Sequence, residues 1–135
     1  MNNSRILVVD DEEDLCEILK FNLENEGYEV DTANSAEEAL KLEISKYNLL
    51  LLDVMMGEIS GFKMASFLKK EKKTSQIPII FITAKDTEND TITGFNVGAD
   101  DYISKPFSLR EVTVRVKAVL KRTRQEESEQ QPEQI

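Results

Sequence analysis

The chain has 135 residues, with 26 acidic and 17 basic side chains and no histidine. This length suits one domain that buries a sizeable core, and the single cysteine excludes an internal disulfide. A formal net charge of −9 disfavours direct binding to nucleic acid, because phosphate backbones would be repelled. No basic start precedes an apolar amino-terminal run, and no segment approaches the ~18–20 apolar residues of a membrane span, so we expect a cytoplasmic protein without membrane contact.

The first third of the chain predicts a strand, a helix and a second strand. Residues 4–9 are an apolar run that ends in a cluster of acids, and leucines then recur at helical spacing until Gly27, which is expected to cap the helix. Cys16 lies within this helical pattern and is interpreted as a small buried hydrophobe, since the chain has no histidine to activate it. Residues 28–33 alternate enough to form a more exposed edge strand.

A second helix and the most apolar strand come next. The sequence Ser-Ala-Glu-Glu at residues 35–38 is typical of a capping box, and the helix that it opens is expected to bury Ala39, Leu40 and Leu42. Residues 49–53 consist of four leucines and Asp53, which indicates a parallel strand buried on both faces.

The second half of the chain predicts three helices and two strands. We expect helices over residues 61–72, over residues 86–97 with weak propensity, and from a capping box at Ser108 to about Arg122. Strands are expected over residues 77–83 and 98–104. The helix over residues 61–72 is expected to bury Met64, Phe67 and Leu68.

Five strands alternating with five helices predict an α/β domain with a parallel sheet covered on both faces and right-handed crossovers. The doubly wound, flavodoxin-like strand order 2-1-3-4-5 fits best, because it places the first and third strands, which are the most hydrophobic, at the centre. We assign residues 1–123 to this domain. From residue 124 on, Gln, Glu, Ser and Pro dominate, so residues 124–135 are expected to form a flexible tail or linker remnant.

Charged and polar side chains follow the expected strands at the edge where parallel strands end. They are Asp10 and Asp11 after the first strand, Asp53 after the third, Thr83 after the fourth and Lys105 after the fifth. Ligands of such sheets bind outside this edge. Three carboxylates there would repel one another unless a cation lay between them, and oxygen ligands without histidine indicate Mg²⁺, with Mn²⁺ as the alternative.

The same residues suit the chemistry of a phosphoryl group. The cation and Lys105 would neutralise its oxygens, Thr83 would donate a hydrogen bond, and Asp53 would attack phosphorus to form an acyl phosphate. A cis bond between Lys105 and Pro106 would aim the lysine back over the site. Two alternatives stay open: Asp53 caps the following loop, or Lys105 is a solvated surface lysine.

Four stretches of the sequence together resemble the receiver domain of bacterial two-component response regulators. They read ILVVDDE at residues 6–12, LLDVMM at 51–56, PIIFITA at 78–84 and GADDYISKPF at 98–107. Each is common alone, but four in this order and at these spacings are highly specific. The resemblance covers residues 5 to about 122.

The resemblance implies Asp53 as the phosphoacceptor for a sensor histidine kinase. Asp11, Asp53 and the Met55 carbonyl would be direct Mg²⁺ ligands, Asp10 would hold the metal through water, and Lys105 would contact the phosphoryl group. The chemistry would be limited to self-phosphorylation on Asp53 and slow self-dephosphorylation, without turnover of external substrates.

The resemblance also implies that Thr83 and Tyr102 act as a switch pair. The Thr83 hydroxyl would be drawn to the new phosphoryl oxygens, the Tyr102 ring would turn into the space that it leaves, and the weak helix over residues 86–97 would move with it. Phosphorylation of Asp53 would thereby change the shape of the domain surface.

The stretch from residue 100 to residue 122 resembles the winged-helix (OmpR/PhoB-like) subfamily of transcriptional regulators, whose receivers pair through the fourth helix, the fifth strand and the fifth helix. We therefore expect a phosphorylation-dependent homodimer, with Asp101 facing Arg115 across the two-fold axis. Intramolecular pairing of these charges is the alternative. DNA would be bound only through a domain absent from this chain. The expected dimer face comprises Asp100, Asp101, Glu111 and Arg115.

Two residues depart from the family pattern. Gly57 stands where the family usually has proline, and Thr91 stands where the winged-helix subfamily often has a basic residue facing Glu111. A stand-alone receiver that acts on a protein partner is an alternative function. A Mg²⁺-dependent phosphatase of the haloacid-dehalogenase type is another, but it needs a second acid two residues after the nucleophile, where Met55 stands.

Overall fold

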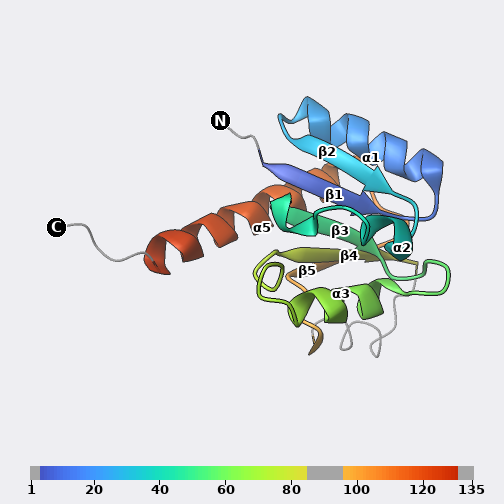
Figure 1. Cartoon of the computed structure of the whole chain (residues 1–135). Helices are drawn as coiled ribbons and strands as arrows, with labels where there is room; N and C mark the ends of the chain where they lie inside the picture. The colour runs from blue at the N-terminus through green and yellow to red at the C-terminus, as the bar shows by residue number, and fades with distance from the viewer. Residues whose placement is uncertain (1–3, 85–95, 131–135) are drawn as a thin grey trace.

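A computed structural model describes residues 4–84 and 96–130 of the chain, with side chains described as far as Arg124. Its centre is a five-stranded sheet in the order β2-β1-β3-β4-β5, in which every neighbouring pair is parallel (Figure 1). This order confirms the predicted doubly wound topology. The strands are β1 (Arg5–Val9), β2 (Glu29–Ala33), β3 (Leu49–Asp53), β4 (Ile79–Thr83) and β5 (Asp101–Ser104).

Helices cover both faces of the sheet. α1 and α5 pack on one face, and α2 and α3 pack on the other, so that the strands lie between two helical layers (Figure 1). The helix expected over residues 86–97 lies almost entirely outside the described residues. The helices are α1 (Glu13–Asn25), α2 (Ala36–Ala39), the 3-10 turn η1 (Ile44–Lys46), α3 (Gly61–Lys69) and α5 (Leu109–Gln130).

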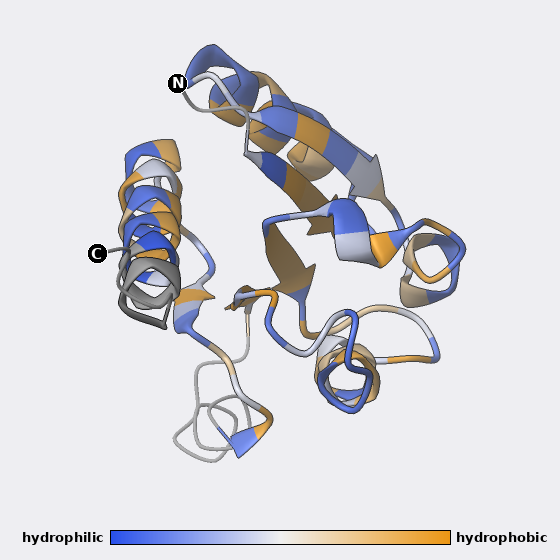
Figure 2. Ribbon diagram, turned by 60° about the vertical axis from the view of Figure 1, so that its left-hand side comes forward, coloured by the Kyte–Doolittle hydropathy of each residue, from blue (hydrophilic) through white to orange (hydrophobic). Residues whose placement is uncertain are grey.

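The four leucines of β3 explain why this strand lies at the centre. Leu50 and Leu52 face the layer of α2 and α3, whereas Leu49 and Leu51 face the layer of α1 and α5, and all four are fully buried. Side chains of a strand alternate between the two faces of a sheet, so a continuous apolar run is needed where both faces are covered. Figure 2 shows the central strands in orange tones and blue stretches on the surrounding helices.

Serine caps fix the starts of three helices. The Ser35 hydroxyl accepts the backbone N–H of Glu38 at 2.9 Å, and the Ser108 hydroxyl accepts that of Glu111 at 3.0 Å, as the capping-box patterns predict. Ser60 caps α3 in the same way, through the N–H of Lys63 at 3.1 Å. After α1, Gly27 adopts φ 99°, a left-handed conformation that favours glycine.

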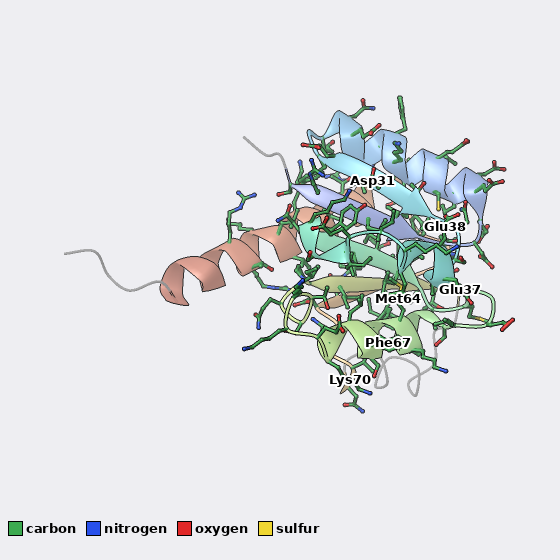
Figure 3. The ribbon with its side chains drawn as sticks, viewed as in Figure 1. Asp31, Glu37, Glu38, Met64, Phe67 and Lys70 are labelled. Carbon is green, nitrogen blue, oxygen red and sulfur yellow. The ribbon has the colours of Figure 1, made fainter. Side chains whose placement is uncertain are left out.

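Some predicted details are wrong. Phe67 is 54% exposed, because the buried stripe of α3 runs through Met64 and Leu68 and leaves Phe67 on its flank (Figure 3). Leu42 is 36% exposed, because α2 ends at Ala39.

The carboxyl-terminal helix is longer than expected. α5 continues to Gln130, beyond the predicted end near Arg122. The division of the chain at residue 124 into a domain and a tail stays a prediction. In the part of the chain that the structure describes, no helix combines the length and apolar character needed to span a membrane.

Candidate functional site

The carboxyl ends of four strands bring together the polar residues singled out from the sequence. Asp10 follows β1, Asp53 ends β3, Thr83 ends β4 and Lys105 follows β5. Asp10 is 2% exposed and Asp53 is 4% exposed, and Thr83 is fully buried. Buried carboxylates are costly unless they are paired or hydrogen-bonded, so their gathering at one edge marks this edge as a candidate site.

Lys105 lies among three carboxylates. Its ammonium group is 3.1 Å from Asp10 Oδ2, 3.0 Å from Glu12 Oε2 and 3.9 Å from Asp53 Oδ1. The bond between Lys105 and Pro106 is cis, and the lysine side chain lies over the site. Lys105 is therefore not a solvated surface lysine.

Burial and like charge perturb the pKa of Asp53. Burial is the largest cause, the negative charge of Asp10 adds to it, and together they raise the pKa of Asp53 to about 7. The opposing contributions are the charge of Lys105 and the backbone N–H of Met55, which donates to Asp53 Oδ1 at 3.3 Å. The Asp53 carboxyl group therefore changes between its protonated and charged forms close to neutral pH when no metal is bound.

Asp10 is held by its own chain. Its Oδ1 atom accepts the backbone N–H of Glu12 at 2.9 Å, while its Oδ2 atom contacts Lys105. Burial raises the pKa of Asp10 even against these favourable contacts. The nearby thiol of Cys16 is 3.3 Å from the Asp10 carbonyl oxygen, and its pKa is raised to about 11, mainly by burial, which agrees with an unreactive cysteine.

The donor set fits a hard divalent cation. Carboxylate oxygens of Asp10, Asp11 and Glu12 lie within 4.8 Å of one another among the residues that the structure describes, and the chain has no histidine. Oxygen donors of this kind suit Mg²⁺ or Mn²⁺. Of the predicted ligands, the structure groups Asp10 and Asp11 directly. Asp53 Oδ1 lies 3.9 Å from the Lys105 ammonium group and accepts the backbone N–H of Met55.

The predicted switch residues lie on adjacent strands. Thr83 ends β4, and its carbonyl oxygen accepts the backbone N–H of Lys105 at 2.8 Å. Tyr102 lies on β5 opposite Phe81, and the two rings pack edge-on with centroids 6.3 Å apart. The backbone therefore connects Thr83 to Lys105, and the Tyr102 ring packs on the residue two positions before Thr83.

Two contacts of the site were not predicted. Glu12 is the nearest partner of Lys105, and Asn34 donates from Nδ2 to the Asp10 carbonyl oxygen at 3.1 Å. Both residues follow strands at the same edge, since Glu12 comes after β1 and Asn34 directly after β2. The rule that selected Asp10 and Asp53 could have found both.

The residues of the expected dimer face pair within the single chain. Arg115 contacts Asp101 at 3.0 Å and Glu111 at 3.2 Å, which is the intramolecular alternative. The Asp100 carboxylate accepts the backbone N–H of Ile79 at 3.0 Å.

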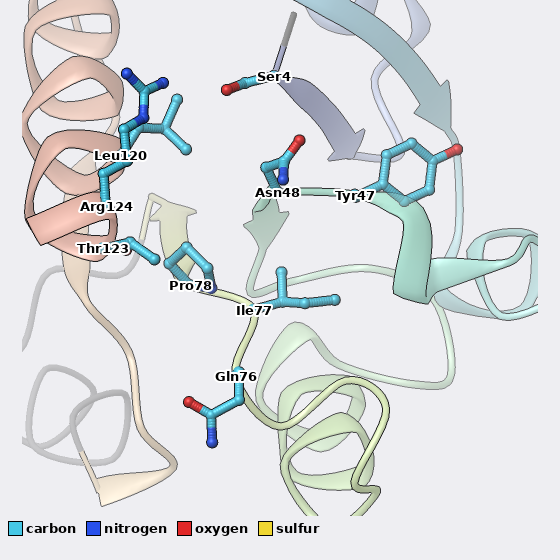
Figure 4. Close-up of a pocket in the computed structure, with 9 residues that line it drawn as sticks. All are labelled: Ser4, Tyr47, Asn48, Gln76, Ile77, Pro78, Leu120, Thr123 and Arg124. Atoms are coloured by element: carbon cyan, nitrogen blue, oxygen red, sulfur yellow. The ribbon is translucent and has the colours of Figure 1, made fainter. Parts of the chain in front are cut away.

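A small cavity lies at the opposite edge of the sheet. It has a volume of about 150 Å³ and is lined by Ser4, Asn48 and Pro78, which precede β1, β3 and β4, and by Leu120 and Thr123 of α5 (Figure 4). Because these residues stand at the amino ends of the strands, the cavity is separate from the acidic site.

The chain matches known receivers in sequence and in structure. Residues 6–117 match the family model for the response regulator receiver domain. The alkaline phosphatase synthesis transcriptional regulatory protein PhoP of Bacillus subtilis is 49% identical over 90% of this chain and 50% of its own length. The transcriptional regulatory protein SrrA of Staphylococcus aureus is 45% identical over 95% of this chain and 52% of its own length.

A solved structure supports the same assignment. The CheY-like response regulator receiver domain protein of Methanospirillum hungatei superposes with a TM-score of 0.85 at 31% identity, covering 93% of this chain and 99% of that one. The chain spans about half the length of the two regulators that it matches. It belongs to the response regulator receiver domain family and is the receiver domain of a two-component response regulator.

Proposed function

We propose that this receiver accepts a phosphoryl group on Asp53 from a phosphohistidine of a sensor kinase, in a reaction that depends on Mg²⁺. The observation that carries the proposal is the environment of Asp53: a 4% exposed carboxylate at the end of the central strand, 3.9 Å from an ammonium group. A nucleophile held at the end of a rigid strand is already oriented for attack.

The transfer exchanges one bond to phosphorus for another. An Asp53 carboxylate oxygen forms the new bond to phosphorus, the bond to the histidine nitrogen breaks, and that nitrogen keeps the electron pair and takes up a proton. Lys105 neutralises charge on the phosphoryl oxygens, and the Thr83 hydroxyl donates to one of them. Asp10, Asp11 and Asp53, with the Met55 carbonyl, would hold Mg²⁺, which supplies further charge neutralisation when bound.

The output is proposed to be a change of surface. After phosphorylation, Thr83 and Tyr102 rearrange, and two receivers pair through a face that includes Asp101 and Arg115. In the full regulator this pairing would control transcription through a DNA-binding domain, as the names of the two relatives suggest for those proteins.

Labelling with a small phosphodonor tests the phosphoacceptor. Acetyl phosphate with Mg²⁺ should add one acid-labile phosphoryl group to the wild type and none to Asp53→Asn, as measured by intact mass spectrometry. Asp31→Asn is the matched control, because it removes a carboxylate from β2 that accepts a hydrogen bond from the Tyr47 hydroxyl and has no proposed role, and it should be labelled like the wild type. Removal of Mg²⁺ with EDTA should abolish labelling. Equal labelling of wild type and Asp53→Asn would refute the assignment.

Sedimentation velocity tests the dimer. Beryllofluoride, a phosphoryl mimic, should convert the monomer to a dimer in the wild type, and Arg115→Ala should weaken this conversion. A sedimentation coefficient unchanged by beryllofluoride at high protein concentration would count against phosphorylation-driven pairing.

A further inference from the structure

We propose that Gly61 is a positioning residue for the phosphoacceptor: the missing side chain lets α3 begin directly against the backbone of Asp53 and so fixes where the carboxylate stands. A β-carbon at position 61 would collide with the Asp53 carbonyl oxygen and would lie 3.0 Å from the Asp53 carbonyl carbon and 3.1 Å from Val54 Cα. The inference rests on the proposed function, because it concerns the residue that accepts the phosphoryl group.

The backbone around Asp53 is held from two sides. On the sheet side, the Val54 N–H donates to the Ile82 carbonyl oxygen at 3.1 Å. On the helix side, the Gly61 N–H donates to the Val54 carbonyl oxygen at 2.9 Å. Residues 54–60 are therefore a loop whose two ends are joined at the point where β3 meets α3. The Met55 N–H, one residue inside this loop, reaches the Asp53 carboxylate.

Neither neighbour can move away to accept a β-carbon at little cost. α3 is anchored by Met64, Ala65 and Leu68, which are buried in the core layer against the sheet. β3 is paired on both sides, with β1 and with β4. Interiors packed to this extent transmit a displacement and do not absorb it, so the clash would shift the Asp53 backbone, the start of α3, or both.

Gly57, which lies inside the loop, is a glycine for a different physical reason than Gly61. Gly57 adopts φ +42°, and a β-carbon there would have no atom within 4 Å. Its requirement is backbone conformation, whereas Gly61 has an ordinary φ and is required for proximity. The close approach to Asp53 therefore belongs to Gly61 and is not a general property of glycines in this loop.

The consequence concerns rate. A misplacement of about 1 Å in a reacting group can cost up to ~10²-fold in rate. We therefore expect Gly61→Ala to lower the rate of Asp53 phosphorylation by acetyl phosphate by about 10- to 100-fold under conditions in which the variant is folded. If Gly61 only stabilised the fold, Gly61→Ala would lower the melting temperature and leave the phosphorylation rate of the folded protein unchanged.

The experiment compares Gly61→Ala with Gly27→Ala in the whole chain. Gly27 lies after α1, adopts φ +99° and has no atom within 4 Å of a β-carbon, so its substitution strains the backbone far from Asp53. Phosphorylation rates are measured by mass spectrometry at a temperature at which circular dichroism shows each protein folded. The proposal requires a rate loss in Gly61→Ala and a rate within about twofold of wild type in Gly27→Ala. Equal rates in Gly61→Ala and wild type would overturn it.

A spectroscopic measurement separates position from stability. The amide resonance of Met55 reports on the Asp53 carboxylate to which it donates, so it should shift in Gly61→Ala and not in Gly27→Ala in ¹⁵N spectra without Mg²⁺. An unshifted Met55 resonance in Gly61→Ala would also overturn the proposal. A wild type that is not phosphorylated would refute the proposed function itself, which is a different outcome.

A second variant decides the matter if Gly61→Ala does not fold. Ser60→Ala removes the cap of α3, since the Ser60 hydroxyl accepts the Lys63 N–H, but it adds no atom near Asp53. The proposal requires Ser60→Ala to be less stable and yet to be phosphorylated at nearly the wild-type rate. A large rate loss in Ser60→Ala would show that any disturbance of α3 displaces Asp53, and that the clearance at Gly61 has no special role.

Discussion

The same strands build two regions of opposite character. Within the sheet, Leu51 and Phe81 are surrounded by apolar side chains and fully buried. At the carboxyl edge, two residues further along the same strands, Asp53 and Thr83 are also buried but are polar. The interior gains stability from burial, whereas the edge holds like charges close together at a cost. The stability of the interior therefore allows a reactive, unfavourable arrangement to persist at the edge.

The largest effect is expected in the interior. Leu51→Ala should lower the free energy of unfolding by about 2–5 kcal/mol, because it removes a fully buried side chain and leaves a cavity between β3 and the α1–α5 layer. Urea denaturation measures this change. Leu42→Ala, at a partly exposed position outside the helices, is the control and should cost far less. Similar losses in both variants would show that burial does not separate the two positions.

At the edge, removal of a charge should have the opposite sign. Without divalent cations at pH 8, Asp53→Asn should raise the free energy of unfolding by about 1–3 kcal/mol, because it removes a buried negative charge close to Asp10. Thermal and urea unfolding in EDTA measure this gain. A loss of stability at pH 8 would show that the contact with Lys105 outweighs burial and repulsion.

The pH dependence sharpens this prediction. The folded-state pKa of Asp53 is raised from 3.8 to about 7, so between these values the folded protein holds a proton that the unfolded chain has released. The wild type should therefore lose stability as pH rises from about 4 through about 7, and Asp53→Asn should lose less over the same range. The raised pKa of Asp10 acts in the same direction in both proteins. Parallel stability curves for the two proteins would contradict this assignment.

The smallest effect is expected at the exposed ion pair. Arg115→Ala should lower the stability of the monomer by only about 0.2–1 kcal/mol, because both Arg115 and its partner Asp101 are partly exposed to solvent. The exposed Arg110 provides the matched control. A loss above about 2 kcal/mol in Arg115→Ala would show that this pair supports the fold, and would weaken the proposal that it is available for pairing between copies.

Features set by regular patterns are the ones that the sequence predicts best. The strand order and the meeting of Asp10, Asp53, Thr83 and Lys105 come from apolar runs and from the rule that parallel strands end at one edge. The same rule places Glu12 at this edge, but which carboxylates pair with Lys105 depends on side-chain rotamers, which the sequence pattern does not fix.

Details that depend on packing were also out of reach. Phe67 has the spacing of a core residue, but the stripe that α3 buries is too narrow to include it. For Arg115 the sequence left pairing with Asp101 within the chain and across a dimer as two alternatives, because the choice depends on the distance between α5 and β5. The roles assigned to Thr83 and Tyr102 as a switch stay predictions.

α5 has a mechanical consequence. It is one uninterrupted helix of 22 residues that runs beside the sheet and projects past the body of the domain (Figure 1). At ~1.5 Å per residue it is a rod of about 33 Å, so a tilt of roughly 10° at Leu109 would carry Gln130 through about 6 Å. A small tilt of α5 near β5 would therefore be magnified into a larger displacement at its far end.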